Sequence, residues 1–499
     1  MDRRHQHLLA VSRVWLPLVL ASLCLSAGCD RQTQSGAPVQ SAASLGVVNA
    51  RSKPEAKVRL HNPPKPLAAE ATTHDWASFL GPTHDAVSSE THLLKEWPAE
   101  GPELVWELPS GTGYAAPAIS GERLVFFHRV DDQATIDCLH PETGQHYWSV
   151  TYPTKYRDRY NYNDGPRASP VIDGDCVYTY SAEGRLHCFD LQTGKERWKK
   201  HLSEKYKVSQ GFFGVGATPL IEGELLIVAV GAPGGPEVIA LNKQTGDLVW
   251  QVGDEWGPSY ASPLPTTLHG QRRILVMGGG ESRPATGGLI SIDPEDGKID
   301  FRFPWRPTSI ESVNASCPVV VDNQIFISAS YNKGGVLLEV QPDFSLRQVW
   351  TGKALSTHFN TAIAKDGYLY GFSGRNEPDA WLVCVEMESG KEMWREQKMW
   401  NETFTYQGQE RSRRSGILRG NLLRVDGQFL CLGERGDLLW LDLTPDGYRE
   451  LARTKMFFAR QTWCLPVISR GLIYICQNEN DPINETKPRL LCYDFRAGQ

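Results

Sequence analysis

The sequence feature that most constrains the fold is a segment that recurs about every 50 residues, seen most clearly at residues 184–198 (GRLHCFDLQTGKERW). Its apolar and polar residues alternate, which predicts one strand over residues 186–190 and a second strand that ends at Trp198. Thr193 and Gly194 lie between them, and glycine adopts the positive φ that a tight turn needs. The segment is therefore predicted to be a β-hairpin.

Eight copies of this hairpin follow one another along the chain. The residues that open their turns lie 45 to 56 positions apart and are His140, Asp190, Asn242, Asp293, Gln341, Glu386, Asp442 and Asp494. A proline-led strand and a second strand precede most of the hairpins, as at Pro170. Proline suits the start of a strand because it has no N–H to give to the ladder. A four-stranded unit with this period is typical of a propeller blade. We therefore predict an all-β fold, an eight-bladed β-propeller of four-stranded antiparallel blades over residues 74–499.

The last repeat is one strand short, because residues 490–495 resemble a third strand and no fourth strand follows before Gln499. Residues 103–109 (ELVWELP) alternate like a strand and precede the first repeat. We expect this N-terminal strand to close the ring, with Trp106 in the place of the missing repeat tryptophan. Closure removes sheet edges that would otherwise be exposed.

The N-terminal region predicts export and anchoring. Residues 1–28 have a charged start, an apolar run over residues 14–25 and a small-residue cleavage region, as in a signal peptide. The sequence LSAGC resembles a bacterial lipobox, so we expect lipidation of Cys29, with cleavage and release as the alternative. Residues 29–73 are rich in Ser, Ala and Pro and almost free of aromatic residues, which predicts a disordered tether. The expected location is the cell envelope, periplasmic and lipid-anchored to the inner or outer membrane.

Composition excludes some functions. The formal net charge is −6 and no basic cluster is long enough to bind nucleic acid. Cys138, Cys188, Cys384 and Cys492 occupy the same position in different repeats. Such positions lie in different blades, so we expect buried packing rather than a disulfide. The sequence contains no CxxC and no HExxH motif, and no metal site is predicted.

The pattern x-Pro-Val-x-x-Gly-x-x-Val-Tyr, followed by Asp-x-x-Thr-Gly-Lys-x-x-Trp, resembles the repeat of the pyrroloquinoline-quinone (PQQ) type propellers. In that family the tryptophan docks between neighbouring blades. The resemblance implies this role for Trp106, Trp148, Trp198, Trp250, Trp350 and Trp394. Residues 75–82 (DWASFLGP) resemble the Trp-x-x-Phe-x-Gly-Pro start of other bacterial relatives. The family includes quinoprotein alcohol dehydrogenases and the non-catalytic outer-membrane assembly lipoprotein BamB.

The resemblance leaves two functions open. A quinoprotein dehydrogenase is expected to carry adjacent cysteines, a calcium site of Glu, Asn and Asp, and a catalytic Asp. The sequence has no adjacent cysteine pair and no acidic cluster with recognisable metal spacing. The leading hypothesis is a membrane-tethered periplasmic scaffold, similar to BamB, that binds a protein partner and has neither a cofactor nor a catalytic residue. The alternative is an oxidoreductase that uses PQQ with Ca²⁺ on an alcohol or a sugar.

Any ligand site is expected at one mouth of the propeller channel, where residues just upstream of the proline-led strands gather. These candidates are Tyr114, Asp164, Arg167, Tyr260, Asn314, His358, Asn360, Gln461 and Trp463. We expect Arg167 to be the strongest anion-binding group, and a small polar ligand or a peptide segment to fit such a mouth. The alternative is that these groups satisfy loop backbones and hold waters in the channel.

Overall fold

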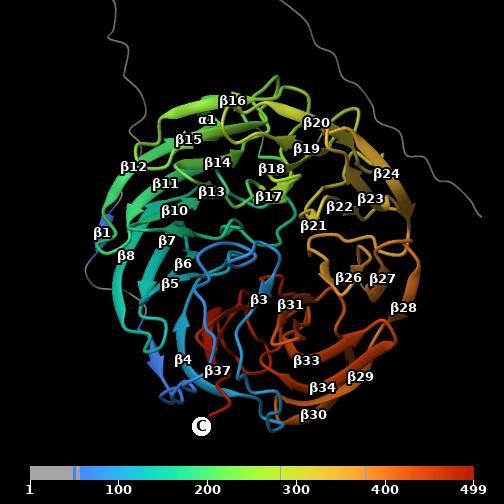
Figure 1. Ribbon diagram of the computed structural model, residues 1–499. Helices are drawn as coiled ribbons and strands as arrows, with labels where there is room; N and C mark the ends of the chain where they lie inside the picture. The colour runs from blue at the N-terminus through green and yellow to red at the C-terminus, as the bar shows by residue number, and fades with distance from the viewer. Residues whose placement is uncertain (1–48, 52–56, 209, 281, 377–378, 499) are drawn as a thin grey trace, which may run out of the picture. The chain divides into compact units, whose positions relative to one another are not determined.

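The structure confirms the predicted propeller (Figure 1). In the part of the chain that it describes, eight sheets surround a central axis, and each sheet contains a blade of four antiparallel strands. This computed structural model describes residues 49–51, 57–208, 210–280, 282–376 and 379–498. The expected signal peptide and Cys29 lie outside these residues. The strands of the blades, from the innermost to the outermost, have the following bounds.

Blades 1 to 4 are β5 (Ala118–Ser120), β6 (Arg123–Val130), β7 (Gln133–Leu139) and β8 (His146–Pro153); β9 (Val171–Asp173), β10 (Cys176–Tyr180), β11 (Arg185–Asp190) and β12 (Glu196–His201); β13 (Leu220–Glu222), β14 (Leu225–Ala229), β15 (Val238–Asn242) and β16 (Leu248–Val252); and β17 (Leu264–Leu268), β18 (Gln271–Gly278), β19 (Gly288–Ile292) and β20 (Ile299–Pro304).

Blades 5 to 8 are β21 (Val319–Val321), β22 (Gln324–Ala329), β23 (Gly334–Val340) and β24 (Leu346–Gly352); β25 (Ile363–Lys365), β26 (Tyr368–Ser373), β27 (Trp381–Glu386) and β28 (Glu392–Glu396); β31 (Asn421–Val425), β32 (Gln428–Leu432), β33 (Asp437–Thr444) and β34 (Gly447–Lys455); and β35 (Val467–Ser469), β36 (Leu472–Gln477), β37 (Arg489–Asp494) and β4 (Glu103–Pro109).

The ring closes through β4, as the sequence predicted. This strand pairs antiparallel with β37, and Trp106 faces Cys492 across the pair. Trp148 and Cys138 have the same relation in blade 1. The N-terminal strand therefore replaces the missing fourth strand of blade 8.

Repeat tryptophans fasten six of the eight blades to the next blade. The indole Nε1 of Trp148 donates a hydrogen bond of 2.9 Å to the carbonyl oxygen of Leu191 in the next blade. Gly194 packs under the same indole, and a Cβ there would lie 2.7 Å from the ring, so the glycine of the repeat is required by this contact as well as by its φ of +70°. The six tryptophans that the resemblance singled out, Trp106, Trp148, Trp198, Trp250, Trp350 and Trp394, all donate to a backbone carbonyl of the following blade.

Ordered structure begins earlier than the expected end of the tether at residue 73. β1 (Asn49–Arg51) pairs with β8, and β2 (Arg59–Leu60) pairs with β4. The backbone of Lys65 donates to Asp494 and accepts from Arg496, at 2.7 Å in both cases. The prediction of disorder was wrong for residues 57–73, because backbone pairing and the Arg496 side chain hold a segment that has little apolar surface of its own.

Two further elements lie outside the blade pattern. A hairpin of β29 (Met399–Tyr406) and β30 (Gln409–Gly416) is inserted between blades 6 and 7, and α1 (Leu202–Tyr206) follows blade 2. Among the described residues, no helix is long and apolar enough to cross a bilayer.

His187 in β11 is a packing residue and provides a pH-dependent test of the fold. It is buried against the rings of Tyr152 and Phe189. Burial, with Lys199 and Arg185 nearby, lowers its pKa from 6.5 to about 3. The unfolded chain therefore binds a proton between pH 6.5 and 3 that the folded chain excludes, so stability falls as the pH falls through this range.

We expect His187→Leu to flatten this acid-side loss of stability by a few kcal/mol, because each unit of pKa difference corresponds to about 1.4 kcal/mol. Urea unfolding at a series of pH values measures the slope. The variant Phe189→Leu, which disturbs the same packing without removing a titrating group, should keep the wild-type slope. A His187→Leu protein with an unchanged slope would contradict the assignment.

Candidate functional site

A cavity of about 300 Å³ lies at the end of the channel where the innermost strands begin, and we call it the mouth pocket. Five of the predicted residues line it: Tyr114, Arg167, Tyr260, His358 and Trp463. Each stands in the loop before the first strand of a blade. The first strands of the blades therefore bring these five side chains together although they are distant in the sequence.

The other four predicted residues fasten loops instead of lining the pocket. The side-chain amide of Asn314 donates to Gly278 and Trp305, and that of Asn360 donates to Gly420. Asp164 accepts from the backbone N–H of Asp158 at 2.7 Å. Gln461 donates to the Tyr114 hydroxyl at 3.4 Å. Their polar groups mainly support backbone and neighbouring side chains.

Arg167 is a clamp within its own loop. Its guanidinium forms an ion pair with Asp158, whose side chain is fully buried, and donates to the carbonyls of Gly165 and Asn163. Asp158 in turn accepts from the backbone of Tyr160 at 2.8 Å. The charge that the sequence offered as an anion-binding group is therefore already balanced by a buried carboxylate.

A second clamp is built from residues that the sequence reasoning missed. Arg419 pairs with the fully buried Glu434 and donates to the carbonyl of Arg375 at 2.9 Å. The indole of Trp463 donates to Glu434 at 3.0 Å. The position of Trp463 in the pocket thus depends on a carboxylate from blade 7.

The missed residues share a signal that is visible in the repeat. Each second strand runs antiparallel to the first, so it ends at the mouth where the first strand begins. Tyr331, Arg375 and Glu434 each follow the end of a second strand by two positions. Residues at this offset belong to the mouth as much as those upstream of the prolines.

His358 is an uncharged polar group in the pocket. Burial, with Arg419 and Arg375 nearby, lowers its pKa from 6.5 to about 3. Its Nε2 lies 3.3 Å from the Tyr331 hydroxyl, and its Nδ1 is buried with no hydrogen-bond partner among the described residues. Burial also raises the pKa of Tyr260 to about 12. Both groups are therefore neutral at physiological pH.

The opposite end of the channel is filled by residues 75–90, which we call the axial segment. Trp76 exchanges backbone hydrogen bonds with Ile119 of blade 1, and β3 (Val87–Ser88) lies parallel to β31 of blade 7. Glu90 accepts from the backbone of Arg470 and Gly471 in blade 8, at 2.7 and 2.8 Å. Burial raises the pKa of Glu90, against the effect of these donors.

The Trp-x-x-Phe-x-Gly-Pro motif shapes this segment. Gly81 has a φ of +80°, and a Cβ there would lie 2.7 Å from the indole of Trp76, so the chain turns tightly over the ring. Phe79, between them, reaches the mouth pocket and lines it. The pocket is thereby floored by the N-terminal segment.

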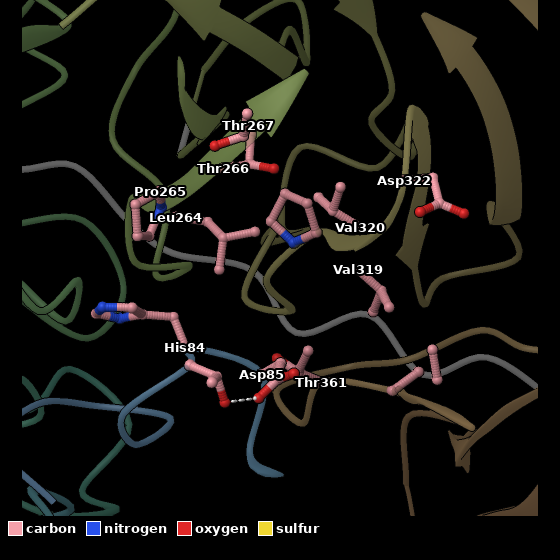
Figure 2. Close-up of a pocket in the computed structure, with 14 residues that line it drawn as sticks. His84, Asp85, Leu264, Pro265, Thr266, Thr267, Val319, Val320, Asp322 and Thr361 are labelled. Carbon is pink, nitrogen blue, oxygen red and sulfur yellow. Dashed lines mark hydrogen bonds between the residues drawn. The ribbon is translucent and has the colours of Figure 1, made fainter. Parts of the chain in front are cut away.

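A second cavity of about 280 Å³ lies beside the axial segment (Figure 2). His84 and Asp85 line it from the axial segment, and Leu264, Val319 and Thr361 line it from blades 4, 5 and 6. Burial, with Arg272 nearby, lowers the pKa of His84. The segment thus reaches from blade 1 to blades 4, 5 and 6 on the far side of the ring.

The residues at the mouth do not fit a calcium-bound quinone. Calcium takes six to eight oxygen ligands, with carboxylates among them. Asp158 and Glu434 are held by arginines, which leaves Glu311 as the carboxylate that lines the pocket. In the described ranges, no group of three His, Cys, Asp or Glu side chains is placed to hold a metal ion. All nine cysteines in these ranges are buried and unpaired.

The four-stranded blades, the tryptophan contacts between them and the closing N-terminal strand define a PQQ-like β-propeller. The profile of one family, described as outer membrane protein assembly factor BamB, matches residues 132–396, just over half of the chain. The chain belongs to this family. None of the curated proteins matches the sequence.

Solved structures with the same fold have low sequence identity to the chain. BamB from Moraxella catarrhalis is 14% identical with a TM-score of 0.52, and the match covers 79% of this chain and 100% of that one. Quinohemoprotein alcohol dehydrogenase from Comamonas testosteroni is 10% identical with a TM-score of 0.57, covering 85% and 81%. A europium-containing methanol dehydrogenase is 11% identical with a TM-score of 0.58, covering 84% and 98%. At these identities the likeness concerns the fold alone.

Proposed function

We propose that the protein is a membrane-tethered binding scaffold of the cell envelope that holds a protein partner. Membership of the BamB family supports this reading, because the family description is that of an outer-membrane assembly factor. The structural observation that carries it is the hairpin β29–β30, an addition to the blade pattern that pairs with no other strand among the described residues.

Contacts with the propeller hold the hairpin as far as Phe404, two residues before Tyr406 at the end of β29. Glu402 forms ion pairs with Arg413 and with Lys455 of β34, both at 2.7 Å. The rings of Phe404 and Phe458 lie 5.3 Å apart. Tyr406 at the tip is 37% exposed. A two-stranded ribbon with free backbone edges is a suitable place for an extended segment of a partner to add a strand.

A photo-crosslinking residue in place of Tyr406 tests this proposal. In intact envelopes it should give one defined protein adduct, whereas the same residue in place of Val249, an exposed position on β16, should give none. Adducts of equal pattern from both positions would argue against a specific partner.

Addition of PQQ and Ca²⁺ to the purified protein, followed by dye reduction with alcohols or sugars, tests the alternative oxidoreductase. If each chain bound one PQQ and then reduced the dye with an alcohol or a sugar, the oxidoreductase function would replace the scaffold proposal.

The anchor is tested separately. If Cys29 carries the lipid, labelling with a radioactive fatty acid should mark the wild-type protein and should be lost completely in Cys29→Ala. The variant should then move from the membrane fraction to the soluble periplasmic fraction, because acyl chains provide the membrane affinity. Cys138→Ala, at a buried blade position, is the matched control and should keep the label. Label retained in Cys29→Ala would exclude this anchor.

A further inference from the structure

The mouth pocket carries a continuous strip of aromatic rings contributed by four blades. Consecutive ring centroids along it lie 5.1 to 6.0 Å apart in the order Phe359, Trp463, Tyr162, Phe213, Tyr160 and Phe212. Tyr160 and Tyr162 are 47% and 44% exposed. All six rings line the cavity. The strip therefore offers apolar ring faces to whatever enters the mouth.

The strip is held in place by the clamps described above. Asp158 accepts from the backbone N–H groups of Tyr160 and Tyr162, at 2.8 and 3.4 Å, and Glu434 holds the indole of Trp463. Side chains with few rotatable bonds in a fixed loop lose little entropy when a ligand binds. The exposed rings are thus arranged before any ligand arrives.

Polar groups lie beside one end of the strip, where His358 contacts Phe359 and Tyr331. The Nδ1 of His358 is buried without a hydrogen-bond partner among the described residues, and the hydroxyl of Tyr331 lies beside the same imidazole. A neutral imidazole and a phenol both exchange hydrogen bonds with hydroxyl groups. The pocket therefore joins apolar faces with neutral donors and acceptors.

The charges that line the pocket balance one another. Arg167 and Arg419 are paired with Asp158 and Glu434. Arg375 stacks on the ring of Tyr331 and has no ion pair in the described part of the chain. Glu311 also has no ion pair there, and its negative charge offsets the positive charge of Arg375. A lining without net charge gives no electrostatic preference for a strongly acidic or basic ligand.

We propose that the mouth pocket binds neutral sugar rings of a glycan. A pyranose has apolar C–H faces that stack on aromatic rings and a polar hydroxyl edge that meets groups such as His358 and Tyr331. A cavity of about 300 Å³ has the size of a small ligand site and takes one or two such rings. This site is separate from the hairpin β29–β30, so it stands whether or not a protein partner is found.

Titration calorimetry on the purified full-length protein tests the proposal with maltopentaose, cellopentaose and chitopentaose as neutral probes. At least one should bind, and Tyr162→Ala should weaken binding at least tenfold. Val249→Ala, at an exposed position on β16 outside the pocket, should leave binding unchanged. Thermal unfolding of both variants checks that they are folded.

The following outcomes would overturn the proposal. One such outcome is that none of the neutral probes binds at about 10 mM, an order-of-magnitude limit for weak sites. A second is that a probe binds Tyr162→Ala as tightly as it binds the wild type. A third is that an oligogalacturonate of equal length binds more tightly than the neutral probes, which would indicate an acidic ligand. A fourth is that a blocked Phe-Trp-Phe tripeptide binds and the neutral probes do not, which would indicate a peptide site.

Discussion

Replacing Trp106 with alanine is expected to lower the free energy of unfolding by about 3 to 5 kcal/mol, the usual range for removal of a buried tryptophan. Trp106 is fully buried, donates to Pro141 of blade 1 at 2.8 Å and lies 5.9 Å from the ring of Tyr474 in blade 8. It also stands on the strand that closes the ring. β4 is held to β37 by backbone pairing and side-chain contacts, without the tight turn that joins the outer strands of the other blades.

Guanidinium denaturation followed by circular dichroism measures the loss, and light scattering follows aggregation. Detachment of β4 would leave β37 as an open edge, so the variant should also aggregate at lower denaturant than the wild type. Trp198→Ala is the matched comparison, because Trp198 makes the same type of contact at 3.1 Å but is only half-buried and stands on a strand joined to its neighbour by a turn. Equal losses and equal aggregation in the two variants would contradict a special role for closure.

Replacing Asp158 with alanine is expected to destabilise the loop of residues 156–167 and the protein by about 3 to 5 kcal/mol, since it leaves the charge of Arg167 buried and unpaired. The side chains of Arg167 and Asp158 are 9% and 0% exposed. The same substitution removes the acceptor for the backbone of Tyr160. Faster amide hydrogen exchange confined to this loop would be the local sign of the change.

The double variant Asp158→Ala, Arg167→Met should recover part of the loss, because no unpaired charge remains inside the protein. Glu339→Ala removes one partner of the exposed pair with Arg347 and should cost about 1 kcal/mol or less. Urea unfolding compares the three proteins. A double variant as unstable as Asp158→Ala would show that the ion pair is not the cause.

Local patterns were sufficient to predict the blades. The turn at Thr193-Gly194, the prolines before the first strands and the recurring tryptophans each act over a few residues or over one repeat, and the structure contains the strands that they indicate. The closing strand was also predictable, because a ring with a missing strand and an unassigned strand at the other end of the chain leave one arrangement without an open edge.

The site was predicted in part. Position before the first strand of a blade was enough to bring Tyr114, Tyr260, His358 and Trp463 to the mouth pocket. The same position did not distinguish them from Asn314, which holds backbone carbonyls. That distinction depends on which way each loop turns, and the turn is set by contacts with neighbouring blades.

The sequence by itself determined the number of blades, their four-stranded plan and the closure of the ring, because these follow from periodicity, turn chemistry and the need to pair every edge. Only the tertiary structure decided how the mouth is charged and how the channel ends. Asp158 neutralises Arg167, Glu434 neutralises Arg419, and the axial segment floors the pocket with Phe79. Each ion pair lies within one loop or one blade, and the axial segment comes from outside the repeats. Such contacts have no period in the sequence because each is made once.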